Sequence, residues 1–206
     1  MLVLYDNPNS SCALRVRFLL AELGLDYERI EVPMTFPRLA SYVELNPLGG
    51  IPTLVDGDFV LSESHTILRY LAAREGRVDL YPDTPRERAR VNEFLDRFAT
   101  GLRSELFRHE AAALGYAEGE FHAEARDSQR ARDIELELEP TLGLLENLIA
   151  DNGTVLGAFT IADASIAPPL NRTLTTGLDL TAYPKLSALR ETILGRPAWS
   201  AAAPGT

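Results

Sequence analysis

Hydrophobic and polar positions follow a mixed pattern in the first part of the chain, where strands alternate with helices. Short apolar runs bounded by turn residues predict buried strands, and apolar positions three and four apart predict helices. The expected strands are 2–5, 28–32, 53–55 and 58–61, and the expected helices run from the serines at 10 and 11 to Gly24, irregularly over 34–45, and from 62–64 to Gly76. Asp56-Gly57 is the strongest short hairpin signal, so the last two strands should be antiparallel. The order βαβ, α, ββα predicts a four-stranded mixed sheet.

The pattern from residue 85 onward is helical almost to the end, and no strand is expected there. Thr84 should cap the first helix, because a proline follows it directly and a glutamate comes three residues later. Thr160 and Asp163 fit the same capping pattern, so we expect them to stabilise a turn rather than to take part in chemistry. The expected helices are 85–114, 123–150 with a kink at Pro140, 161–175 and 184–195.

Composition narrows the classes of function. The net charge of −10 opposes binding to nucleic acid phosphates, and no cluster of basic residues offsets it. No apolar run reaches the roughly 18 residues of a membrane span, and no basic leader precedes the first strand. Cys12 is the single cysteine, which fits a reducing compartment. We therefore expect a cytoplasmic protein that binds neither nucleic acid nor membrane, and the three scattered histidines predict no metal site.

Five motifs in register carry a family resemblance. Three lie in the first part: Ser10-Ser11-Cys12 ahead of Arg15-Val16-Arg17, the segment Asn46-Pro47-x-Gly49-x-Ile51-Pro52, and Glu63-Ser64 after the hairpin. Two lie in the second part: Gly157-x-x-Thr160-x-x-Asp163, and Tyr183-Pro184 through Arg196-Pro197-Ala198-Trp199. Together with the order of elements, they make the whole chain resemble the cytosolic glutathione transferases.

This resemblance implies a thioredoxin-like α/β domain followed by an all-helical domain. The expected boundaries are 1–76 for the glutathione-binding domain, 77–86 for a proline-containing linker, and 87–206 for the helical domain. The family's activity would be detoxification, in which glutathione as co-substrate attacks a small hydrophobic electrophile lodged between the domains. The resemblance also implies a homodimer.

The expected glutathione site uses Ile51, Pro52, Glu63 and Ser64. The resemblance implies a cis peptide bond before Pro52, which turns the backbone of Ile51 toward the ligand's cysteine. Glu63 would answer the γ-glutamyl ammonium while Ser64 and the first helical N–H groups hold the carboxylate; alternatively, the pair only caps a helix. Gly50 stands where many relatives carry Lys or Gln for the glycyl end, so Arg38 or Tyr42 are candidate substitutes.

The candidates that activate the thiol are Ser10, Ser11 and Cys12. A thiol of pKa ~8.5 is only a few per cent ionised at pH 7, and a donated hydroxyl stabilises the reactive thiolate. We expect Ser10 to be this donor and Ser11 to cap the helix. Cys12 is either a partner in disulfide exchange with glutathione or a small buried residue. Tyr5 lies where other classes place a catalytic tyrosine, but the serines favour a serine-type site.

Several other residues are predicted to have structural roles. Arg15 and Arg17 should form structural ion pairs, and the aromatic residues of the first long helix should be core or dimer contacts. The motif around Cys12 resembles the zeta class, which isomerises maleylacetoacetate, although Leu14 replaces its usual tryptophan and Arg172 is out of register with its substrate-binding arginine. The alternatives to conjugation are therefore glutathione-dependent isomerisation, reductive dehalogenation, disulfide exchange through Cys12, or a non-catalytic scaffold.

Overall fold

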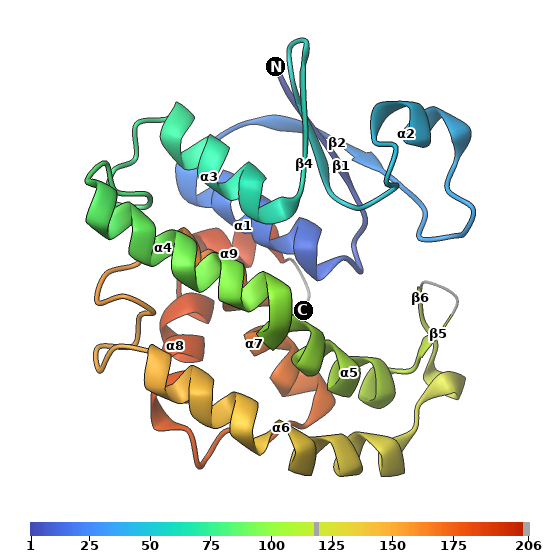
Figure 1. The fold of residues 1–206 in the computed structure, drawn as a ribbon. Coiled ribbons are helices and arrows are strands. Elements are labelled where there is room, and N and C mark those ends of the chain that lie inside the picture. The colour runs from blue at the N-terminus through green and yellow to red at the C-terminus, as the bar shows by residue number, and fades with distance from the viewer. Residues whose placement is uncertain (118–119, 204–206) are drawn as a thin grey trace.

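The computed structural model describes residues 1–117 and 120–203, and it confirms the four-stranded mixed sheet. The strand order is β2-β1-β3-β4, with β1 parallel to β2 and antiparallel to β3, and β4 antiparallel to β3 (Figure 1). The strands are β1 (Leu2–Asp6), β2 (Tyr27–Glu31), β3 (Thr53–Asp56) and β4 (Phe59–Ser62). Leu4 lies opposite Leu54 in the β1–β3 register, and both are buried in the core.

The N-terminal half contains three helices, of which the first joins the two halves of the molecule. They are α1 (Ser11–Leu23), α2 (Ala40–Leu45) and α3 (Ser64–Arg74). Helix α1 is buried along most of its length and ends at Gly24, whose left-handed φ of 65° closes the last turn as expected. It packs against α3 and against α7 (Ile161–Thr176) and α9 (Pro197–Ala202) of the other half. One hydrophobic core therefore runs through both parts of the described chain.

The C-terminal half is helical, with bounds close to those expected. Its remaining helices are α4 (Pro85–Arg97), α5 (Arg103–Leu114), α6 (Ser128–Leu148) and α8 (Pro184–Leu194). Thr84 caps α4 as predicted, and Thr160 and Asp163 form a complete capping box at the start of α7. Burial raises the pKa of the Asp163 carboxyl to about 6. Residues 204–206, the end of the expected helical domain, lie outside the described residues.

Two expectations for this half are wrong. The helix expected over 85–114 is interrupted by a π-helical turn, η1 (Phe98–Leu102), which contains the weak helix former Gly101. A short antiparallel hairpin, β5 (Tyr116–Ala117) with β6 (Glu120–Phe121), follows α5 where no strand was expected. Strands of two residues are too short to produce an alternating pattern. The cross-strand ring pair of Tyr116 and Phe121, with centroids 5.1 Å apart, supports the hairpin instead.

The helix expected from residue 123 also begins later. Residues 123–125 form a single 3₁₀ turn, η2 (Ala123–Ala125), and α6 starts only after Asp127, whose side chain accepts a hydrogen bond from the Arg130 N–H at 2.8 Å. Pro140 lies inside α6. Among the described residues, no helix combines the length and the apolar character needed to cross a membrane.

Candidate functional site

Two adjoining pockets meet at the start of α1 and form the candidate site. The smaller has a volume of about 60 Å³ and lies between α1, the segment that joins α2 to β3, and the start of α3. The larger, of about 320 Å³, lies between α1 and the helices of the C-terminal half. Cys12 lines both, so a ligand that fills the small pocket reaches the large one beside this residue.

The small pocket brings together four of the predicted glutathione-binding residues. Ile51, Pro52, Glu63 and Ser64 all line it. The peptide bond between Ile51 and Pro52 is cis, as expected. Residues more than ten positions apart in the sequence thus converge on one cavity, which is the arrangement that recognition of a small peptide needs.

Glu63 has an unusual backbone conformation at the edge of this pocket. Its φ of 69° is the only positive φ of a non-glycine among the described residues. It occupies the N-cap position of α3, yet its side chain makes no capping hydrogen bond and stays exposed without a partner in the described chain. Its side chain therefore does not cap α3, and its alternative role as an acid favoured by the dipole at the start of the helix stays a prediction. Strain of this kind persists where the surrounding structure imposes it, often at binding sites.

Ser64 begins α3 and is buried next to an arginine. Its hydroxyl lies 3.4 Å from Nη1 of Arg15, and the same Nη1 lies 2.6 Å from Nε2 of His65. The expectation that Arg15 forms an ion pair is wrong, because its partners here are neutral. Arg17 does form one, with Asp6 at 2.6 Å. Arg15 and Arg17 differ in their partners because residues two positions apart on a helix face different neighbours.

The expectation that Ser11 caps α1 is wrong, because the cap is Ser10. Ser10 is the N-cap of α1, and its hydroxyl accepts a hydrogen bond from the Ala13 N–H at 3.2 Å. Ser11 is already helical, and its hydroxyl accepts from Nη2 of Arg103 at 2.9 Å. The Ser10 hydroxyl faces the Ile51 carbonyl at 3.5 Å, the outer limit of a hydrogen bond. The reason is the turn before the helix, in which the Ser10 N–H bonds to the Asn7 carbonyl.

The structure does not bring Arg38 or Tyr42 into the small pocket. Arg38 donates to the backbone carbonyls of Gly49, Pro33 and Thr35 at 2.9–3.1 Å and so holds the loop before α2. The Tyr42 hydroxyl is directed to the Gly50 carbonyl and to Thr53. In the described chain the lining of this pocket therefore contains no cation. Gly50 has no side chain that could bind the glycyl carboxylate of the expected ligand.

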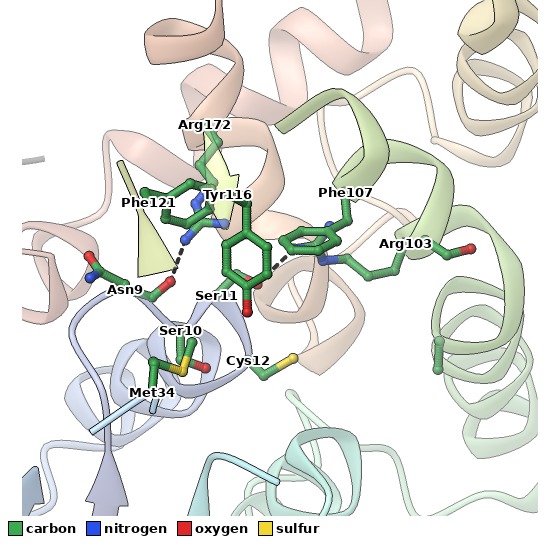
Figure 2. Close-up of a pocket in the computed structure, with 12 residues that line it drawn as sticks. Asn9, Ser10, Ser11, Cys12, Met34, Arg103, Phe107, Tyr116, Phe121 and Arg172 are labelled. Carbon is green, nitrogen blue, oxygen red and sulfur yellow. Dashed lines mark hydrogen bonds between the residues drawn. The ribbon is translucent and has the colours of Figure 1, made fainter. Parts of the chain in front are cut away.

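The larger pocket combines aromatic rings with two arginines (Figure 2). Arg103 and Arg172 both contact Oε2 of the buried Glu110, at 3.1 and 2.7 Å. Each guanidinium also stacks on a ring, Arg103 over Phe107 and Arg172 over Phe121. Two cations share one carboxylate, and Nη1 of Arg103 is buried without a partner in the described residues. The lining therefore combines apolar rings with two guanidinium groups whose charges are opposed by a single carboxylate.

Comparisons with known proteins agree with this geometry. The family model described as glutathione S-transferase, N-terminal domain, matches residues 9–74. A probable maleylacetoacetate isomerase of Caenorhabditis elegans is 32% identical over 98% of this chain and 92% of its own length. Glutathione S-transferase GstB of Escherichia coli K12 is also 32% identical, over 96% of this chain and 95% of its own. The chain belongs to the cytosolic glutathione transferase superfamily.

Solved structures of glutathione transferases have the same fold. A theta class enzyme from Xanthomonas axonopodis pv. citri, solved with glutathione bound, superposes with a TM-score of 0.86 at 26% identity, covering 100% of this chain and 98% of that one. Glutathione S-transferase III in apo form gives a TM-score of 0.79 at 30% identity, with 99% and 96% covered. The thioredoxin-like domain followed by a helical domain is therefore confirmed.

Sequence reasoning missed much of the larger pocket. Arg103 follows the π-turn and carries no motif, and Tyr116 and Phe121 lie on the hairpin that was not expected. Met34 and Asn9 reach the pocket from loops. Arg172, which was considered and found out of register, does line it. The one available signal was the density of aromatic and arginine residues between 103 and 121.

Proposed function

We propose that this protein binds glutathione in the small pocket and adds its thiolate to an electrophile held in the larger pocket. The observation that carries the proposal is that both pockets open at Cys12, at the N-terminus of α1. A tripeptide anchored at Glu63 and Ser64 would place its sulfur at this shared edge. Expectations of a homodimer, a cytoplasmic location and a role in detoxification remain predictions.

Each of these residues of the small pocket would bind one group of glutathione. Glu63 would pair with the γ-glutamyl ammonium, and the Ser64 hydroxyl with the free N–H groups of α3 would hold the carboxylate. Ile51 would face the cysteinyl backbone. Ser10 can continue to accept from the Ala13 N–H while its proton moves from the distant Ile51 carbonyl to the sulfur, where the bond is charge-assisted and stronger.

The reaction follows from a thiolate placed beside an apolar pocket. Its sulfur donates an electron pair to an electrophilic carbon and forms a C–S bond. In a substitution the leaving group departs with its bonding pair, and in an addition the neighbouring carbon takes up a proton. The partial positive charge at the N-terminus of α1 and the Ser10 hydroxyl stabilise the thiolate.

A second candidate, glutathione-dependent isomerisation of an acidic substrate, is supported by Arg103 and Arg172. Their shared Glu110 leaves positive charge in the larger pocket, which suits a carboxylate attached to an unsaturated chain. There the thiolate adds to the double bond, the bond rotates, and elimination regenerates glutathione. A relative described as a probable maleylacetoacetate isomerase supports the same class.

The first experiment is calorimetric titration with glutathione, followed by turnover of a neutral aryl halide and of an unsaturated diacid. We expect heat with glutathione, and the faster electrophile distinguishes conjugation from isomerisation. Arg103→Met should reduce turnover of the diacid while leaving the aryl halide within about twofold. No heat at millimolar glutathione would reject the proposal in favour of a scaffold.

The second experiment separates the three candidates at the start of α1. Ser10→Ala should lower the ionised fraction of bound thiol roughly ten- to hundredfold and cost about 1 kcal/mol of stability, because the residue is also the N-cap. Ser10→Thr keeps both groups and is the control. Cys12→Ala should keep conjugation and lose any disulfide exchange. A Ser10→Ala variant with normal thiolate absorbance would transfer the role to Ser11 or Cys12.

A further inference from the structure

Arg15 is a buried cation that lacks an anionic partner. Its exposed fraction is 2%, and its contacts are the Ser64 hydroxyl and the His65 ring. Its Nε and Nη2 are buried and have no hydrogen-bond partner among the described residues. A guanidinium stays protonated even when buried, so its charge is present but uncompensated in the unliganded protein. Buried charges in proteins are normally paired with an opposite charge, and the charge of Arg15 is not.

No anionic group among the described residues forms an ion pair with Arg15. His65 on α3 is neutral, because burial first and Arg15 second lower its pKa to about 2. Phe98, which opens the π-turn, presents its ring at 5.7 Å from the guanidinium carbon. Burial lowers the pKa of Arg15 most, Cys12 and Glu110 act electrostatically to raise it, and Arg103 acts to lower it. Retaining an arginine here therefore costs stability in the free protein.

The position of Arg15 relates it to the site. It lies three residues after Cys12 on α1, so the two share a helix face, and helical side chains lean toward the N-terminus. Its guanidinium thus lies behind the edge where the two pockets meet. It also touches Ser64, the expected partner of the γ-glutamyl carboxylate. Both anionic groups of an ionised glutathione at this end would be near it.

We propose that Arg15 is the positioning residue that supplies the counter-charge for bound glutathione thiolate, acting through space on the sulfur and through Ser64 on the carboxylate. The inference rests on the proposed function. The cation donates to Ser64 Oγ, which leaves the hydroxyl proton free for the ligand. In this dry surrounding a charge acts over several ångströms with little screening.

The test compares Arg15→Met with Arg17→Met. Arg17 is also buried on the same helix but is paired with Asp6, so it serves as the control. The thiol pKa of bound glutathione is measured by the pH dependence of thiolate absorbance. We expect Arg15→Met to raise it by about one unit, a tenfold loss of thiolate at neutral pH. Arg17→Met should lower the melting temperature and leave the thiol pKa unchanged.

Further variants keep the inference falsifiable if Arg15→Met does not fold. Arg15→Gln retains a hydrogen-bond donor without the charge and should show the same raised thiol pKa, whereas Arg15→Lys should stay near wild type. S-methylglutathione, which has no ionisable thiol, should lose less affinity than glutathione in Arg15→Gln.

The remaining outcomes each decide against the inference. Folded Arg15→Met or Arg15→Gln with an unchanged thiol pKa would overturn it while leaving the proposed function intact. If only Arg15→Lys folds, the charge serves the fold and the inference fails. Absence of glutathione binding in the wild type would overturn the inference and the proposed function together.

Discussion

At the scale of single residues, Glu63 offers a separation of binding from folding. We expect Glu63→Gly to stabilise the protein by about 1 kcal/mol, because glycine adopts a positive φ without the strain of a side chain. The same change should weaken glutathione binding by roughly tenfold or more, since the ammonium loses its anion. Thermal unfolding and calorimetry measure the two effects.

Asp58→Ala is the control, because Asp58 is another exposed acid of the same domain that does not line the pocket. It changes the net charge equally and should alter neither quantity by more than about 0.5 kcal/mol. Equal affinity in Glu63→Gly and wild type would remove Glu63 from the binding site.

Gly50 allows a gain of function. A side chain is accommodated there, since an added Cβ would meet only Nδ2 of Asn46 at 3.9 Å and the φ is not positive. Gly50→Lys should tighten glutathione binding by about two- to fivefold through the glycyl carboxylate, the range of an exposed ion pair. Gly50→Glu should weaken binding by a similar factor. Matching affinities for the two variants would show that the glycyl carboxylate lies elsewhere.

At the scale of elements, the free energy of unfolding depends on pH through His65, which lies on α3. Its pKa falls from 6.5 to about 2 in the folded protein, so the stability it provides is present above pH 6.5 and is lost as the pH falls. Below pH 6.5 the loss should approach about 1.4 kcal/mol per pH unit, or about 2 kcal/mol at pH 5.

His65→Gln isolates this effect, because the difference in stability from wild type cancels all other titrations. Asp163 acts in the opposite direction: its raised pKa gives stability that is present below 3.8 and lost as the pH rises through about 6. Denaturant unfolding of wild type and His65→Gln between pH 4.5 and 7.5 measures the contribution of His65, and a difference in stability that stays constant with pH would refute the assignment.

Helices and strands were predictable from the sequence where a pattern of apolar residues repeats. Details of the site that depend on the geometry of a single turn were not. The hairpin between β3 and β4 and the helix stop at Gly24 depend on local chemistry and form as expected, although the two-residue turn is Gly57-Asp58 and not Asp56-Gly57. Which serine caps α1 depends on one hydrogen bond to Asn7. The surroundings of Arg15 depend on how α3 and the π-turn pack against α1, which no local pattern encodes.

At the scale of the whole molecule, the two halves should unfold together. Arg172 donates to the Asn9 carbonyl at 2.6 Å, and Arg17 to the Ala202 carbonyl at 3.2 Å, so polar contacts join the halves beside the shared core. We expect one thermal transition, raised by glutathione through mass action. Calorimetry that resolves two transitions, with only one moved by glutathione, would contradict this.

The π-turn at Phe98–Leu102 has a consequence for how the larger pocket can diverge. A π-turn holds one residue more than the α-helical turn it replaces, so it has the form of a one-residue insertion that the helix absorbed. If the same sequence closed this stretch as α-helix, every residue after it would shift by one position, about 100° around the axis, and Arg103 and Phe107 would turn off the pocket together. Deleting one residue within the turn would instead restore an α-helical turn and leave Arg103 and Phe107 in place. The wall of the pocket therefore tolerates the loss of one codon here, but not a change in how the helix winds.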